Sequence, residues 1–179
     1  MPEAEAELVR KFLRCYGPST ARYFSLWLGC SLKQANRLWQ QVAPEMTAVK
    51  AGGKTAYMLE CDLPDLLDAD GDEEKLLLLG GHDPYLGLRD RKLILEDERL
   101  HKMIWKFVAN PGVVLQGGRI IGTWKTIIHD DTVDFLITIW QELSAAEEDK
   151  LKALAREYIA FRSLKLRIRK LETCSLEHL

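Results

Sequence analysis

The fold of the first third of this chain is decided by the stretch Gly29-Cys30-Ser31-Leu32-Lys33-Gln34-Ala35-Asn36-Arg37-Leu38-Trp39-Gln40-Gln41-Val42. Apolar residues after Ser31 recur three, three, one and three positions apart, which is the spacing of one face of an α-helix. Ser31 is suited to cap the start of that helix, and Gly29 is suited to end a preceding helix in the left-handed conformation. The stretch therefore predicts two helices joined by a short turn.

The sequence on either side of this stretch completes a recognisable order of elements. An apolar stripe over 8–13 predicts a first helix, and Pro18-Ser19-Thr20 opens a second one. After Pro44, two short runs around Gly52-Gly53 predict a β-hairpin. Helix, helix, short turn, helix and hairpin is the order of a winged-helix domain, which we predict over 1–60.

In a winged helix, the third helix can enter the major groove of DNA, and the hairpin lies near the phosphate backbone. The polar residues on the outward side of helix 31–42 and the two lysines of the hairpin are therefore candidate DNA contacts. The alternative is that the module packs against another protein domain, while the polar helix face only meets solvent. The candidate DNA-binding residues are Lys33, Gln34, Arg37, Gln40, Lys50 and Lys54.

Charge divides the chain. Residues 1–60 carry a net charge of +3, and residues 61–75 hold seven acids and one lysine, for a net charge of −6. We interpret the acidic stretch as a linker between two units. The whole chain has a formal charge of −2, so it is not basic throughout, although a local patch can still bind phosphate.

The second unit is predicted to be rich in strands. Apolar runs at 76–79 and 93–95, a hairpin signal around Gly117-Gly118, and further runs at 126–128 and 133–140 give about five strands. This number predicts a small antiparallel β-barrel or a curved sheet over 76–143. The fold class is therefore α+β: a winged-helix domain, a barrel or curved sheet, and a C-terminal helix.

The end of the chain is predicted to be an amphipathic helix with a frayed tail over 144–179. Ser144-Ala145-Ala146-Glu147 is a capping box at its start. Basic residues gather near its end, between Arg162 and Lys170. They suit the helix dipole in one interpretation and form a DNA-binding patch in the other.

A loop rich in hydrogen-bonding groups lies at 81–91, after the first strand of the second unit. Its acids and arginines can form ion pairs that staple the loop, or the arginines can hold phosphate oxygens in bidentate fashion. Both interpretations stay open. The residues of this loop that we single out are Asp83, Tyr85, Arg89, Asp90 and Arg91.

No catalytic or cofactor motif is found. The sequence has no phosphate-binding glycine loop and no serine-hydrolase, zinc-peptidase or kinase motif. Its four cysteines and four histidines are not clustered, so we expect neither a metal site nor another cofactor. The acidic N-terminus and the absence of a long apolar run predict a cytoplasmic protein with no membrane contact.

Three segments resemble a bacterial family of winged-helix DNA-binding proteins that includes the AlkZ-like DNA glycosylases. Residues 16–29 resemble the start of the family's last winged helix. Residues 83–91 resemble its Asp-Pro-Tyr…Arg-Asp-Arg segment, and residues 117–124 resemble the strand pair that follows. The resemblance implies tandem winged helices closed by a C-terminal β-barrel, in proteins some of which excise alkylated or crosslinked bases.

The resemblance also implies a catalytic triplet, Gln-aliphatic-Gln or Gln-aliphatic-Asp, in the N-terminal part of the family. This chain lacks the triplet: Gln40-Gln41 are adjacent, and Gln116 and Gln141 stand alone. The chain is also about half the family's length. We therefore expect this chain to be either the non-catalytic C-terminal part of such a protein, with a winged-helix half upstream of it, or a short relative. In both cases we expect it to bind double-stranded DNA. The alternative is a structural module that docks on another protein domain.

Overall fold

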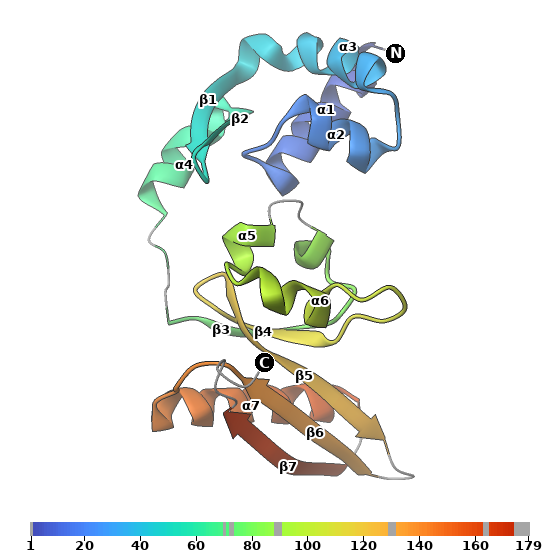
Figure 1. Ribbon diagram of the computed structural model, residues 1–179. Coiled ribbons are helices and arrows are strands. Elements are labelled where there is room, and N and C mark those ends of the chain that lie inside the picture. Colours follow the sequence, from blue (N-terminus) through green and yellow to red (C-terminus); the bar gives the residue numbers. More distant parts are fainter. Residues whose placement is uncertain are drawn as a thin grey trace. The chain divides into compact units, whose positions relative to one another are not determined.

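The chain divides into two compact units, 1–70 and 71–179 (Figure 1). The computed structural model describes residues 2–69, 71, 74–87, 91–128, 132–162 and, as backbone alone, 165–173. Among these residues, no helix is both long enough and apolar enough to cross a membrane.

The first unit consists of helices followed by a two-stranded antiparallel hairpin, and the expected helices and hairpin are confirmed. The acidic stretch at 61–75, expected to be a linker, contains a short helix. In chain order the elements are α1 (Pro2–Tyr16), α2 (Ala21–Leu28), α3 (Leu32–Val42), η1 (Ala43–Glu45), β1 (Met46–Ala51), β2 (Lys54–Leu59), η2 (Glu60–Asp62) and α4 (Leu63–Asp68).

Local signals explain where the helices begin and end. The Thr20 hydroxyl accepts a hydrogen bond from the Tyr23 amide and caps α2, and Gly29 ends that helix with φ of 70°. The Ser31 hydroxyl accepts from the Gln34 amide at 3.2 Å and caps α3. These caps fix the short turn between α2 and α3.

The core of the first unit is aromatic. Phe12 of α1 packs against Phe24 of α2, with ring centroids 5.1 Å apart, and against Trp39 of α3 at 6.5 Å. The connection between α1 and α2 also joins the hairpin. Ser19 and Tyr57 exchange two backbone hydrogen bonds of 2.8 Å, so Ser19 pairs with β2 from outside the hairpin.

The second unit is built on an open five-stranded sheet in the order β3-β4-β5-β6-β7, in which the first four strands are antiparallel and β7 runs parallel to β6. Its strands are β3 (Leu76–Leu79), β4 (Gly112–Gln116), β5 (Arg119–Ile128), β6 (Thr132–Ile139) and β7 (Lys165–Thr173). Its helices are η3 (Pro84–Gly87), α5 (Arg91–Ile94), η4 (Glu98–Leu100), α6 (His101–Ile104) and α7 (Ala145–Phe161).

The open sheet corrects the barrel expectation and supports the sheet alternative. A parallel neighbour requires a crossover connection, and α7 provides it between β6 and β7. The helix packs against one face of the sheet, and β3 and β7 are the two edge strands of the described sheet, which do not pair with each other. The C-terminal helix accordingly ends at Phe161, and residues 165–173 form a strand where a helix end and frayed tail were expected.

A second correction concerns the apolar run 93–95, expected to be a strand. It lies at the end of α5 and in the following coil, where Ile94 and Leu95 are buried. A short apolar run fits a buried strand and a buried helical turn equally well, so its length could not decide between them.

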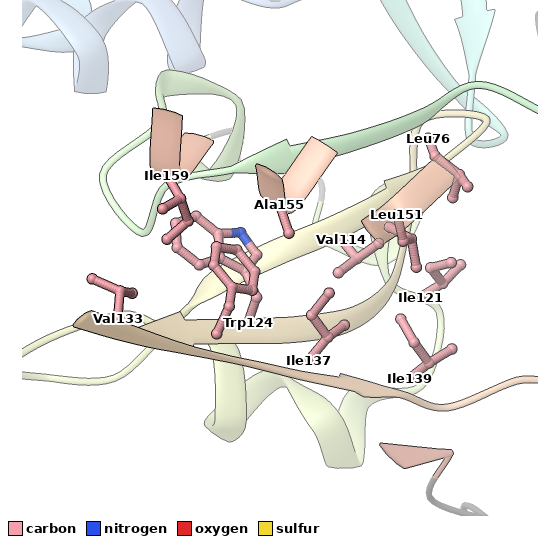
Figure 2. Packing of buried hydrophobic residues seen from close by; sticks show 11 residues of the cluster. Leu76, Val114, Ile121, Trp124, Val133, Ile137, Ile139, Leu151, Ala155 and Ile159 are labelled. Atoms are coloured by element: carbon pink, nitrogen blue, oxygen red, sulfur yellow. The ribbon is translucent and has the colours of Figure 1, made fainter. Parts of the chain in front are cut away.

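Each face of the sheet carries its own core. Side chains of β4, β5 and β6 point toward Leu151, Ala155 and Ile159 of α7 (Figure 2). On the other face, β4 and β5 pack against η3, α5, η4 and α6. The sheet is irregular at Gly122: the β4–β5 register shifts beside it, and a Cβ there would lie 2.3 Å from the Thr138 carbonyl oxygen.

Candidate nucleic-acid interface

The helix α3 has one apolar side, which is buried in the core of the first unit, and one polar side, which faces outward. Ala35, Leu38, Trp39 and Val42 are buried. The residues on the opposite side are exposed and are called the α3 outer face below: Lys33, Gln34, Arg37 and Gln40.

One residue of the α3 outer face is already bound. The Arg37 guanidinium donates two hydrogen bonds of 2.9 Å to the Glu5 carboxylate of α1, and the Gln41 amide donates a third at 3.1 Å. These donors lower the pKa of Glu5 to about 2. An acid therefore sits beside the face that was predicted to meet phosphates, and sequence reasoning missed it because Glu5 lies 32 residues before Arg37.

The hairpin presents its two lysines at the surface. Lys50 and Lys54 are exposed, and the Lys50 ammonium donates to the Thr55 hydroxyl at 2.9 Å across the β1–β2 ladder. The turn between the strands is formed by Gly52 and Gly53, both with positive φ, as a type I′ hairpin requires.

The motif loop of the second unit is fastened by its own polar groups. The Asp83 carboxylate accepts from the Tyr85 amide at 2.9 Å and opens η3. The Tyr85 hydroxyl donates to the Gly118 carbonyl oxygen at 2.7 Å, and partial burial raises the pKa of Tyr85. Arg89 and Asp90, predicted to belong to the same site, lie outside the described residues.

Arg91 lies over the ring of Trp105, with its guanidinium carbon 4.6 Å from the ring centroid. The Trp105 indole in turn donates to the Leu86 carbonyl oxygen at 2.8 Å. These contacts link Arg91 to the loop through an aromatic side chain, a connection that ion-pair reasoning from the sequence did not foresee.

A cavity of about 980 Å³ opens between α5, the start of β5 and the end of β6. Gln116 and Gln141 lie at its edge, but their amides are engaged: Gln141 donates to Gln116 at 2.6 Å, and Gln116 donates to Glu147 at 2.5 Å. Glu147 also accepts from the Ser144 amide in the expected capping box, and these donors lower its pKa. The two glutamines therefore serve the start of α7.

No group of three or more His, Cys, Asp or Glu side chains converges into a possible metal site in the part of the chain that the structure describes. Of the cysteines described, Cys15 and Cys61 are exposed and Cys30 is half-buried, all as free thiols.

Comparison with known proteins assigns the family. The profile of the family described as "DNA glycosylase AlkZ-like" matches residues 1–161, and the chain belongs to this family. It is 29% identical over 131 residues to the interstrand DNA cross-link repair glycosylase of Streptomyces sahachiroi, a match that spans 70% of this chain and 35% of that protein.

A solved structure, the DNA glycosylase AlkZ of Streptomyces sahachiroi, shares the fold. Its TM-score is 0.76 at 22% sequence identity, and the match covers 94% of this chain and 46% of the solved chain. The chain therefore spans less than half the length of both relatives.

Proposed function

We propose that this chain is a DNA-binding part of an AlkZ-like DNA-repair protein, and that it holds duplex DNA through phosphates with the α3 outer face and the hairpin of a winged-helix domain. The observation that carries the proposal is the joint exposure of Lys33, Lys50 and Lys54 on α3 and the hairpin that follows it, within the stretch 1–60, whose net charge is +3. Helix, helix, short turn, helix and hairpin support the winged-helix assignment, and so does the pairing of Ser19 with β2.

The expected binding is electrostatic and largely independent of sequence. Lysines that neutralise phosphates release counterions, so the logarithm of the affinity falls linearly with the logarithm of the salt concentration. Phosphate contacts fix the position of a protein on DNA but carry no sequence information directly. Gln34 and Gln40, whose side chains are exposed on the same face, are the candidates for contacts with base edges.

A charge-reversal pair tests this proposal. Lys33→Glu combined with Lys50→Glu should weaken binding to a labelled duplex about tenfold or more at ~50 mM salt, and equally for unrelated sequences. The salt slope, which is the slope of the logarithm of affinity against the logarithm of salt concentration, should become smaller in magnitude by about 2. Lys11→Glu, on an exposed position of α1, changes the charge of the same unit by half as much as the pair and is the control. A loss of binding free energy in the control that is half the loss in the pair would mean that only overall charge matters, and duplex binding that is unchanged in the pair would refute the proposal.

We further propose that this chain by itself does not excise bases from DNA. The support is the missing glutamine triplet and the engagement of Gln116 and Gln141 at the start of α7. Purified chain incubated with duplex containing alkylated bases should release no base above the rate of a protein-free control. Lesion-dependent release would overturn this proposal and leave DNA binding standing.

A further inference from the structure

We infer that Phe107 and Val108 form an apolar wedge that enters duplex DNA, while the lysines beside them hold a phosphate. This inference rests on the proposed function and extends it to the second unit. The two residues lie midway along the connection between α6 and β4 and are called its tip below. Figure 1 shows this connection projecting as an open loop. Their exposed fractions are 104% and 89%, so neither side chain is covered.

The loop that carries the wedge is held at both ends. The Lys106 amide donates to the Asn110 side-chain oxygen at 2.9 Å, and the Asn110 amide group donates to the Gly81 carbonyl oxygen at 3.1 Å. A Cβ on Gly81 would lie 2.3 Å from the Asn110 carbonyl oxygen, so this approach requires glycine. On the other side, Trp105 is fixed by its bond to Leu86. Hydrogen bonds therefore hold the loop on both sides of Phe107 and Val108.

Beside the loop lies a groove of about 270 Å³ whose charged lining is basic. Lys106 from the loop and Lys125 from β5 both line it, and no acid is among the described residues around it. We call this cavity the lysine groove; the residues relevant here are Met103, Lys106, Pro111, Thr123, Lys125 and Thr138.

The combination fits duplex DNA. A phosphate group has the charge that two lysines attract and an otherwise polar surface that suits Thr123 and Thr138. Phenylalanine and other apolar side chains inserted between base steps partly unstack them and bend the duplex. An aromatic side chain exposed beside a basic groove is unfavourably hydrated in the free protein. Stacking on a base removes its ring from water and stabilises the complex with DNA.

The test uses the full chain and a duplex that carries 2-aminopurine, whose fluorescence rises when the base is unstacked, together with end labels for energy transfer. Wild-type protein should raise the fluorescence and shorten the end-to-end distance. Phe107→Ala should abolish both signals and weaken binding about tenfold, with an unchanged salt slope. Lys106→Gln together with Lys125→Gln should lower the salt slope by about 2. Phe161→Ala is the matched control, because Phe161 is also exposed (86%) but lies at the end of α7.

The outcomes separate this inference from the proposed function. Salt-dependent duplex binding that Phe107→Ala leaves unchanged, with no 2-aminopurine signal, overturns the wedge and retains the winged-helix proposal. No duplex binding by wild-type protein overturns both. Binding of wild-type protein, but not Phe107→Ala, to anionic phospholipid vesicles in place of duplex assigns the tip to a membrane surface and also overturns the wedge.

Discussion

The α3 outer face and the loop 80–87 differ in where their polar groups are directed. On α3, Lys33, Gln34 and Gln40 extend outward from a helix whose opposite side is sealed in an aromatic core. In the loop, Asp83 and Tyr85 turn back onto the backbone and bind it. Both segments looked suited to phosphate, yet only the first leaves its side-chain groups largely available.

A high density of polar groups in a segment is therefore a poor guide to whether those groups are available to a ligand. The interior of a helix satisfies its own backbone, so its outward side chains are not needed as partners for backbone groups. A tight loop has unpaired backbone amides and carbonyls, which must find partners, and the nearest polar side chains supply them. The predictions below test whether the loop residues serve stability and the α3 residues serve binding.

The largest expected effect is on the loop. Gly81→Ala would place a methyl group 2.3 Å from the Asn110 carbonyl oxygen, so we expect the free energy of unfolding of the second unit to fall by about 2 kcal/mol. Gly80→Ala is the control, since nothing lies within 4 Å of its Cβ position. Chemical denaturation of both variants gives the comparison. Equal stability of the two would contradict the close approach.

The next prediction tests whether Asp83 stabilises the loop or belongs to the DNA-binding surface. Asp83→Ala removes the acceptor of the Tyr85 amide and should lower the free energy of unfolding by about 1 kcal/mol, while duplex affinity stays constant. Asp83→Asn keeps an acceptor oxygen and should recover most of the loss. A drop in duplex affinity without a loss of stability would move Asp83 to the binding surface.

Arg91→Ala should change stability less than the two preceding variants do. Whether it lowers stability or duplex affinity decides if Arg91 holds the loop together or binds phosphate. Removing its contact with Trp105 in Arg91→Ala should cost about 0.5–1 kcal/mol of unfolding free energy, as for exposed cation–π pairs. If Arg91 were a phosphate clamp, the variant would keep its stability and lose duplex affinity. Thermal unfolding and duplex titration of the same preparation distinguish the two.

The smallest effect is expected at Glu5. Glu5→Gln removes an acid of α1 that lies beside the α3 outer face and frees Arg37, so affinity for duplex should rise about two- to fivefold at low salt. An unchanged or lower affinity would show that Arg37 does not meet phosphate.

The same variant has a pH signature. Because the pKa of Glu5 lies at about 2 in the folded chain, below its usual value of 4.5, the ion pair stabilises the fold above that usual value. This contribution is lost as the pH falls toward 2. The gap in melting temperature between wild type and Glu5→Gln should be small, since the pair is exposed, and should be narrower at pH ~3 than at pH ~6.

Local sequence signals predicted the parts of the fold that depend on neighbours in the chain. Gly29 and Ser31 mark the α2–α3 turn, and Ser144 marks the start of α7, because a cap needs only three or four adjacent residues. These signals do not decide exposure: Leu26 of α2 is 48% exposed, because it lies off the face shared by Ala21, Phe24 and Leu28.

Features that depend on distant partners could not be predicted. The sequence of β7 alternates over Lys165-Leu166-Arg167-Ile168-Arg169, but its parallel pairing with β6 depends on the crossover by α7. The Glu5–Arg37 pair joins residues of different helices. Phe107 and Val108 gave no signal, because in a sequence they look like any other core residues. Exposure, which only the structure supplies, made them candidates for the interface.

The pairing of Ser19 with Tyr57 has a mechanical consequence. Two hydrogen bonds of 2.8 Å connect the segment just before α2 to the outer side of β2. A force that tilts the hairpin is therefore transmitted to the start of α2 and, through the short Gly29 turn, to α3. We therefore expect the hairpin and the α2–α3 pair to move together, so that a ligand bound at Lys50 or Lys54 would also change the orientation of α3.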